Sequence, residues 1–393
     1  MRVTLLAPFP VRKVFGQRLI YSTKNSVEHH ATWIVNCMEL LLQRKDIDLH
    51  LVTLAPHISK DYLFFENGVH YHLLRGGHYL GQIASFYQLD RLRLKLELTK
   101  IMPDVIEAFG TEGPYAYAAV SSGFPTVVYI QGIIFELIKK MRASLIDPQW
   151  IHHFFTQYFE RWTIRKGNYY IAENEFGADF VKRLNPNAKI YILPNIISPL
   201  FFQENIEHAV DNQEILFVGS LSILKGGIDL IGAFEIISKI KPKTFLTVIG
   251  NVSLDIKKII ELLPTRTQES ISLLGKKDQT FIINKMKEKP IFVYPSKMDS
   301  SPNSVYEAMI AGLPVVATKV GGLPYMIEDG KNGYLIDSQN PELLAERILY
   351  LLEHPEERRR IGTNASRVTR KRLDPQRIAQ ELVAIYMEVA AQE

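Results

Sequence analysis

The chain has 393 residues, 47% of them hydrophobic and 22% charged, which suits a globular protein with two domains of roughly 200 residues each. Its formal net charge of +4 is too small for the dense basic stripe of a nucleic-acid-binding protein. No run approaches the roughly 18 apolar residues of a membrane-spanning helix, and the first apolar run is too short for a signal peptide. The single cysteine, Cys37, excludes an internal disulfide, so we expect a cytoplasmic protein without an export signal.

Short apolar runs rich in β-branched residues alternate with longer amphipathic segments along the whole chain. The runs that we expect to be strands are 2–8, 49–55, 104–110, 125–131, 168–174, 189–195, 214–220, 243–250, 270–276, 291–296 and 313–318. They are nearly apolar on both faces, as parallel strands covered by helices require. Segments such as 27–43 and 227–240 suit the crossover helices. The alternation predicts a doubly wound α/β fold.

Residues 91–100 fit two kinds of element. Polar and apolar residues alternate there as in a half-buried strand, but leucines four residues apart also suit a helix. Because a strand is expected directly afterwards, and parallel strands need a crossover between them, we expect a helix.

The alternation breaks once, at 195–213, where a proline and several polar and acidic residues show no periodicity. We interpret this segment as a linker between a first domain at 1–200 and a second at 201–375. The remaining residues, 376–393, form a strong helical pattern opened by an Asp-Pro start signal. A return of this last helix to the first domain is kept as a hypothesis.

The stretch PNSVYEAMIAGLPVVATKVGG, residues 302–322, predicts a helix at 303–311 after the loop that follows the strand at 291–296. Asn303 or Ser301 is the expected N-cap, and Gly312 ends the helix. Loops at the carboxyl ends of parallel strands bind ligands in α/β domains. After Pro302, the backbone N–H groups of Asn303, Ser304 and Val305 would be available to a phosphate or diphosphate.

Two carboxylates bracket this expected phosphate site. Asp299 lies in the loop, and Glu307 lies about one turn into the helix. Carboxylates repel phosphate but accept hydrogen bonds from hydroxyl groups, which both a sugar and a ribose supply. The pattern therefore suits a sugar–diphosphate–nucleoside, although an ordinary helix with a surface acid would show the same spacing.

Residues 299–322 resemble the signature of retaining glycosyltransferases of family 4, the glycosyl transferases group 1 domain of the GT-B fold. The family usually has Glu at both ends of the spacing, whereas here the first is Asp299, one methylene shorter. The segment 217–227, FVGSLSILKGG, is similar to the Gly-Arg-Leu…Lys-Gly segment of the family. It keeps Gly219 and Lys225, but Ser220 stands where the family has Arg. The resemblance implies that Lys225 neutralises most of the donor diphosphate.

Three further segments extend the resemblance. The segment around Asn195 is similar to an interdomain Pro-Asn-Gly segment, and SLLGK resembles a base-contacting segment, which points to Lys276. The first half matches less well. Asn25 and Ser26 replace two glycines, although Glu28 is kept and Gly16 occurs earlier. Gln131-Gly132 replaces His-Gly, so a general acid or base role at that position is in doubt.

The resemblance implies two Rossmann-like domains facing a central cleft, with acceptor binding in the first domain and donor binding in the second. It implies transfer on one face of the sugar, in which the departing phosphate oxygen takes the acceptor's proton. In this mechanism Asp299 orients the donor sugar and Glu307 the ribose. No cofactor or metal is required, the donor is a nucleotide sugar, and the acceptor is a glycan, a lipid-linked sugar or another hydroxyl compound.

The first half of the chain is slightly basic. Residues 1–200 contain 22 Lys and Arg against 17 Asp and Glu, a net +5, so the remainder carries −1 of the total +4. We keep peripheral binding to an anionic membrane surface at the inner face as a hypothesis. Ordinary solubility charge explains the same excess.

The patterns that could suggest a metal site are weak. The Asp-Ile-Asp at 46–48 suits a solvated turn, and His70 and His72 share a strand face without an evident third ligand. We therefore predict no metal site.

Other functions are possible for an α/β protein of this kind. A dinucleotide-dependent oxidoreductase would need Gly-x-Gly-x-x-Gly after a strand, and the first strand is followed by nothing similar. A non-catalytic GT-B relative that binds a sugar nucleotide or a protein partner stays open, as do a phosphorylase and an epimerase. Retention of Asp299, Glu307 and Lys225 favours a glycosyltransferase for polysaccharide or glycoconjugate biosynthesis.

Overall fold

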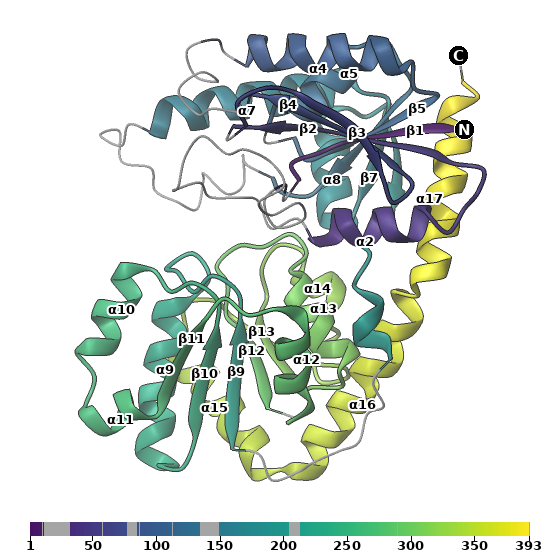
Figure 1. The fold of residues 1–393 in the computed structure, drawn as a ribbon. Helices are drawn as coiled ribbons and strands as arrows, with labels where there is room; N and C mark the ends of the chain where they lie inside the picture. Colours follow the sequence, from purple (N-terminus) through teal and green to yellow (C-terminus); the bar gives the residue numbers. More distant parts are fainter. Residues whose placement is uncertain are drawn as a thin grey trace. The chain divides into compact units, whose positions relative to one another are not determined.

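The computed structural model describes residues 1–9, 11, 32–56, 58–76, 85, 87–111, 113–133, 149–203, 213–288 and 290–392. The chain divides into two compact units, Met1–Ile196 with Pro375–Glu393, and Ile197–Asp374 (Figure 1). The sequence-based boundary at 200 falls a few residues after this division. Among the described residues, no helix has the length and apolar character needed to cross a membrane.

The first unit is built on one eight-stranded sheet in the order β3-β4-β2-β1-β5-β6-β7-β8. Its strands are β1 (Arg2–Leu6), β2 (Asp48–Ala55), β3 (Tyr62–Glu66), β4 (Val69–Arg75), β5 (Val105–Phe109), β6 (Thr126–Ile130), β7 (Tyr169–Ala172) and β8 (Lys189–Ile192). All neighbours pair in parallel except β3 and β4, which form an antiparallel hairpin at one edge. The central strands are mostly apolar and almost entirely buried because helices cover both faces.

The helices of the first unit are α2 (Thr32–Leu41), α4 (Gln88–Ile101), α5 (Pro114–Val120), α7 (Gln149–Lys166), α8 (Glu175–Leu184) and α17 (Pro375–Ala390). The ambiguous segment 91–100 lies within α4, so the helical prediction is confirmed. Leu94 and Leu98 are buried, whereas Leu92 and Leu96 are exposed. A helix explains this pattern, because residues four apart share one of its faces.

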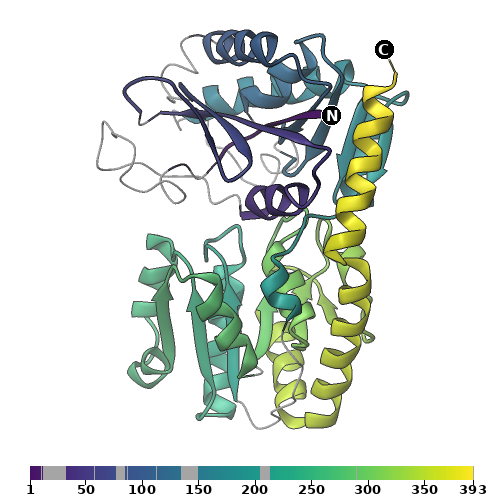
Figure 2. The same cartoon turned by 45° about the vertical axis from the view of Figure 1, so that its right-hand side comes forward.

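The last helix, α17, belongs to the first unit, although the whole second unit precedes it in the chain (Figure 2). It packs against α2, β5 and β6. Tyr386 of α17 is fully buried and donates a hydrogen bond from its hydroxyl to Glu107 of β5. The second oxygen of Glu107 has no partner among the described residues, and burial raises the pKa of this carboxyl to about 8. Glu107 is therefore mostly protonated at neutral pH.

The second unit contains a six-stranded parallel sheet in the order β11-β10-β9-β12-β13-β14. Its strands are β9 (Glu214–Val218), β10 (Phe245–Ile249), β11 (Ile271–Gly275), β12 (Ile291–Tyr294), β13 (Val315–Thr318) and β14 (Tyr334–Ile336). Its helices are η2 (Pro199–Phe202), α9 (Gly227–Ile240), α10 (Leu254–Glu261), α11 (Thr265–Glu269), α12 (Gln279–Lys287), α13 (Asn303–Ile310), α14 (Leu323–Met326), α15 (Pro341–Glu353) and α16 (Pro355–Arg372). Both sheets confirm the predicted doubly wound α/β fold.

The buried carboxyl of Glu107 makes the stability of the first unit pH-dependent. In the folded state the pKa of Glu107 is about 8, above its ordinary value of 4.5. The contribution of this carboxyl to the unfolding free energy is therefore complete below pH 4.5 and is lost as pH rises toward 8. We expect Glu107→Gln to abolish this loss and to raise the unfolding free energy near pH 8 by about 2–4 kcal/mol. Urea unfolding of both proteins across this pH range measures the difference. Parallel pH profiles for the two proteins would contradict the assignment.

Candidate active site

Strands β9 and β12 lie side by side at the centre of the second sheet, and the strand order reverses between them. The chain moves outward through β10 and β11 on one side and through β13 and β14 on the other. The loop after β9 and the loop after β12 therefore leave the sheet next to each other, at its carboxyl edge. A crevice at such a switch point is the usual ligand site of an open α/β sheet.

An ion pair joins these two loops. The Lys225 ammonium, in the loop after β9, contacts Asp299 Oδ2, in the loop after β12. The hydroxyl of Tyr294, the last residue of β12, donates to the same oxygen at 2.7 Å. The side chains of Lys225 and Asp299 are 28% and 15% exposed, so the pair is partly shielded from water. A partly buried ion pair with a third hydrogen-bonding group is held more firmly than a surface pair.

Tyr294 is a site residue that the sequence did not reveal. Its ring stacks on Phe217 of β9, with centroids 5.7 Å apart and an interplanar angle of 6°. Burial, and then the nearby Asp299, raise the pKa of Tyr294 well above its ordinary value, so its hydroxyl stays a donor. One feature of the sequence could have indicated this role: the tyrosine ends an expected strand, five residues before the loop carboxylate Asp299.

Backbone contacts hold the two loops in register. The amide of Lys297 donates to the carbonyl of Leu224 at 2.9 Å, and the Ser222 hydroxyl accepts from the amide of Lys225 at 3.3 Å. Gly226 has φ +73°, and a Cβ there would lie 1.8 Å from the carbonyl oxygen of Pro295. The loop that carries Lys225 can therefore approach the other loop only with glycine at this position.

The carbonyl of Asp299 is held by the glycine pair that ends the signature stretch. The amide of Gly322 donates to it at 2.9 Å. Gly321 has φ +54°, and a Cβ at this residue would lie 1.9 Å from the same carbonyl oxygen. This pair thus sets the backbone position of Asp299 and explains the glycines at the end of the stretch.

Helix α13 begins at Asn303, as predicted, and ends at Ile310, one residue earlier than expected. Its N-cap is Pro302, without a side-chain cap bond, so the expectation of Asn303 or Ser301 as the cap is wrong. The amide of Val305 donates to the carbonyl of Pro302 at 3.0 Å and is not available to a ligand. The amide of Ser304, in contrast, has no partner within the described part of the chain. A proline in place of a capping side chain leaves this helix end open to an anion.

Glu307 lies on α13, about one turn from its start, and its side chain is partly exposed. Its carboxylate makes no hydrogen bond or ion pair with the described residues. Burial raises its pKa to about 7. A partly buried carboxyl without a protein partner is a common feature of a binding site.

The other predicted donor residues lie along the same edge of the sheet. Gly219 directly follows β9 with φ +147°, and its amide donates to the carbonyl of Ile249 in β10. Ser220 follows it and is exposed. Lys276 is exposed after β11, the outermost strand on that side, and so lies two strands from β9. Of these predicted residues, Lys225 and Asp299 contact each other, whereas Lys276 does not contact either of them.

The predicted residues of the first half are only partly described. Gly16 and Glu28 lie outside the described residues. Gln131 and Gly132 follow β6, and the side-chain nitrogen of Gln131 is buried without a partner among the described residues. Asn195 is buried and donates to Glu173, within the first unit.

Comparison with known proteins supports the reading of the second unit. Residues 201–368 match the family described as glycosyl transferases group 1. The spore coat protein SA of Bacillus subtilis is 35% identical over 182 residues, which are 44% of this chain and 48% of that protein. This match thus spans about half the length of that relative. A protein named uncharacterized glycosyltransferase of Methanocaldococcus jannaschii is 26% identical over 85% of this chain and 88% of its own.

Solved structures resemble the whole chain at low sequence identity. Sucrose-phosphate synthase from Thermosynechococcus elongatus covers 100% of both chains with a TM-score of 0.78 and 15% identity. HepE of Anabaena, solved in complex with UDP-glucose, covers 99% of this chain and 100% of its own with a TM-score of 0.67 and 17% identity. These similarities show the fold, which is GT-B. The family match itself assigns residues 201–368, within the second unit, to the glycosyl transferases group 1 family.

Proposed function

We propose that the chain is a retaining, metal-independent glycosyltransferase of family 4 that moves a sugar from a nucleotide-diphosphate sugar to a hydroxyl acceptor. The observation that carries the proposal is the contact of Lys225 with Asp299 at the switch point of the second sheet. A cation for the diphosphate and a carboxylate for the sugar meet there, beside the loop that leads into α13. The family match over residues 201–368 supports the same function.

The donor diphosphate is proposed to bind between Lys225 and the first turn of α13. The Lys225 ammonium supplies a full positive charge, and the α13 start supplies the Ser304 amide with the positive end of the helix dipole. Since Ser220 replaces the Arg of the family, no guanidinium stands at that position. Lys225 therefore has to neutralise most of the charge that develops on the leaving diphosphate.

Asp299 is proposed to orient the donor sugar. Its Oδ2 already accepts from Lys225 and Tyr294, which leaves Oδ1 for a sugar hydroxyl. Tyr294 acts as a positioning residue, because it holds the carboxylate without reaching the substrate itself. The shorter side chain of Asp299 is compatible with this role because the Gly321–Gly322 pair fixes the backbone behind it.

The proposed chemistry needs no protein nucleophile. The acceptor hydroxyl attacks on the face that the diphosphate leaves, through an oxocarbenium-like state, and a departing phosphate oxygen takes its proton. The protein supplies charge stabilisation and alignment, which are the two largest contributions to catalysis of this kind. The solved relative bound to UDP-glucose supports a nucleotide-sugar donor for this chain.

The acceptor is proposed to be a glycan or lipid-linked sugar bound by the first unit, in polysaccharide or glycoconjugate biosynthesis at the cytoplasmic face of the membrane. Helix α7 contributes a pocket of about 350 Å³ whose lining includes two aromatic and three basic side chains: Tyr158, Arg161, Trp162, Arg165 and Lys166. Aromatic rings beside cations suit a lipid interface with anionic headgroups. This pocket supports the hypothesis of a peripheral membrane contact.

Donor binding tests the proposed function directly. We expect one of the UDP-, GDP- or ADP-sugars to raise the melting temperature of the wild-type protein, because it binds only the folded state. Lys225→Met should lose this rise, since the diphosphate loses its cation, while Lys239→Met, an exposed lysine of α9, should keep it. NMR of the product's anomeric centre then tests retention. Inverted configuration would refute the mechanism, and donor binding without hydrolysis or transfer would favour the non-catalytic alternative.

Glu307 should control both rate and pH dependence. In this proposal the ionised carboxylate accepts hydrogen bonds from two ribose hydroxyls. Donor affinity should therefore increase as pH rises through about 7, the pKa of Glu307. Glu307→Gln should have a flat affinity profile, and Glu307→Ala should lower kcat about 100- to 1,000-fold, the usual effect of losing one charged contact. Both variants should fold, because the carboxylate has no partner in the described structure. Isothermal titration at several pH values and initial rates measure these effects; wild-type turnover by Glu307→Ala would remove this residue from the site.

The membrane hypothesis has a separate test. Vesicles with anionic lipid should carry the wild-type protein upward in a flotation gradient at low salt, and neutral vesicles should not. The double variant Arg165→Glu, Lys166→Glu should remain at the bottom of the gradient. Lys331→Glu, which changes the charge of an exposed residue in the second unit, should float like the wild type. Flotation that is equal for all three proteins would exclude α7 as the contact surface.

A further inference from the structure

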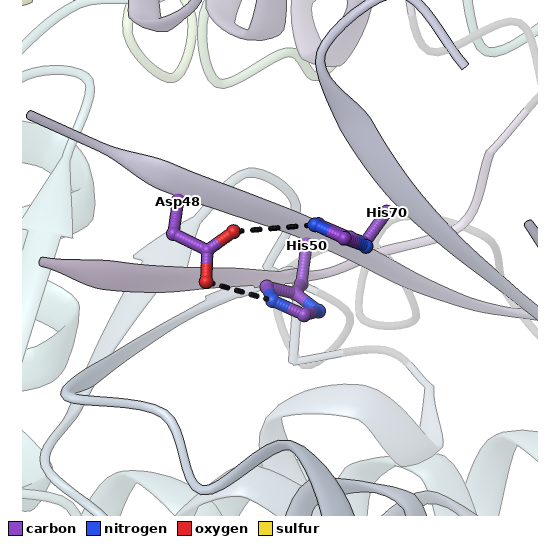
Figure 3. Close-up of side chains that lie close together, drawn as sticks. All are labelled: Asp48, His50 and His70. Atoms are coloured by element: carbon purple, nitrogen blue, oxygen red, sulfur yellow. Dashed lines mark hydrogen bonds and ion pairs between the residues drawn. The ribbon is translucent and has the colours of Figure 1, made fainter. Parts of the chain in front are cut away.

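A second cluster of chemically reactive side chains lies in the first unit, on β2 and β4 (Figure 3). Asp48 and His50 are two residues apart on β2 and therefore share a face of the sheet. His70 on the neighbouring strand pairs directly with His50 in the parallel register. The sequence did not indicate this grouping, because Asp48 was interpreted as part of a turn, and His70 was paired with His72 without an evident third ligand.

The ligand atoms of these three residues converge. Asp48 Oδ2 lies 3.4 Å from His50 Nε2, and Asp48 Oδ1 lies 3.4 Å from His70 Nε2. All three potential ligand atoms lie within 4.8 Å of one another. The two imidazole rings are stacked, with centroids 4.5 Å apart. Separations of this size are close to those between the ligands of a bound ion with bonds of about 2 Å.

The remaining atoms of the cluster show which nitrogens can accept a metal. Glu97 on α4 accepts from Lys100 Nζ at 2.7 Å and lies 2.8 Å from His72 Nδ1. The carboxylate is therefore an acceptor, and His72 Nδ1 carries the proton. His72 Nε2 lies 3.0 Å from His50 Nδ1. His50 Nδ1 is therefore engaged by His72, and His50 Nε2 is the nitrogen that faces Asp48.

His50 Nε2 faces Asp48 Oδ2, and His70 Nε2 faces Asp48 Oδ1. Two acceptors 3.4 Å apart repel one another unless a proton or a metal ion lies between them. His50 is 9% exposed, so this group of side chains is largely shielded from water on the His50 side. Arg2 donates a hydrogen bond from its Nε to the same Asp48 oxygen at 3.1 Å. A cation that both histidines share relieves the repulsion directly.

We propose that Asp48, His50 and His70 form a binding site for a divalent transition ion of the zinc type, with water as the fourth ligand. Two imidazoles and one carboxylate are a usual ligand set for such an ion, and they exclude calcium and magnesium, which prefer oxygen ligands. His70 and Asp48 are each 43% exposed, so the ion has a route of entry. The His72–Glu97 pair orients His50 from behind, and Arg2 orients Asp48, as outer-shell groups do in metal sites.

The position of this site separates it from the proposed chemistry. Asp48 is the first residue of β2 and His70 the second of β4, so the ion would lie at the amino ends of these strands. Ligands of an α/β sheet bind at the carboxyl ends, and the donor residues lie in the other unit. The ion would therefore tie β2 to β4 and stabilise the first unit, while transfer itself would remain independent of metal.

Metal titration of the full chain tests this inference. At slightly alkaline pH, where protons do not compete for imidazole nitrogens, wild-type protein should bind Zn²⁺ in competition with a chromogenic chelator. Co²⁺ in the same site should show the intense visible bands of a tetrahedral ion. His70→Ala and Asp48→Asn should each weaken this binding at least tenfold and remove the Co²⁺ bands. His354→Ala, which changes a histidine of the second unit, should bind like the wild type.

A graded variant separates orientation from ligation. Glu97→Gln should weaken Zn²⁺ binding about 10- to 100-fold but keep the tetrahedral Co²⁺ bands, because it disturbs the residue behind His50 and removes no ligand. Urea unfolding without metal checks that each variant is folded, and added Zn²⁺ should stabilise only the proteins that keep the site. Wild-type Zn²⁺ affinity in His70→Ala and Asp48→Asn, or no Zn²⁺ binding by the folded wild-type protein, would overturn the proposal.

Discussion

The contact between Lys225 and Asp299 is the interaction on which the proposed function of the second unit depends. Two loops that are far apart in the sequence carry these residues, and the reversal of strand order between β9 and β12 brings the loops together. Neither charge would be useful alone, because an isolated carboxylate repels a diphosphate and an isolated ammonium has no fixed direction. Tyr294 and the Gly321–Gly322 pair hold Asp299 from the side chain and from the backbone, so the pair is placed before any substrate arrives. Such preorganisation is what makes a charged contact effective in catalysis.

Much of this organisation could be predicted from the sequence, because it depends on local patterns. Apolar runs identified the strands. The pattern of residues 91–100 by itself fitted both a strand and a helix. The strand expected next to that segment settled it as α4. The start of α13 was also predictable, and Lys225 and Asp299 could be named as candidates, since each occupies a fixed place in a short motif. The sequence could not place Tyr294, because its role depends on a ring stack with Phe217 across two strands.

The errors have physical causes as well. The expected cap at Asn303 or Ser301 was wrong because Pro302 already adopts extended backbone geometry, and its carbonyl accepts the Val305 amide. A capping preference describes isolated helices, whereas here the loop from β12 determines the entry angle. The cluster of Asp48, His50 and His70 could not be predicted from the sequence either, since it depends on the register between β2 and β4. Register between parallel strands is set by packing over the whole sheet and leaves no mark in a short window.

The return of α17 to the first unit makes the second unit an insertion between two parts of the first. During synthesis all of residues 197–374 leave the ribosome before the helix that buries Tyr386 against Glu107. The second unit can therefore complete its core while β5 and β6 still lack their cover. The core of the first unit is consequently completed only after the second unit has been synthesised, so the order of the two units' folding follows from the path of the chain.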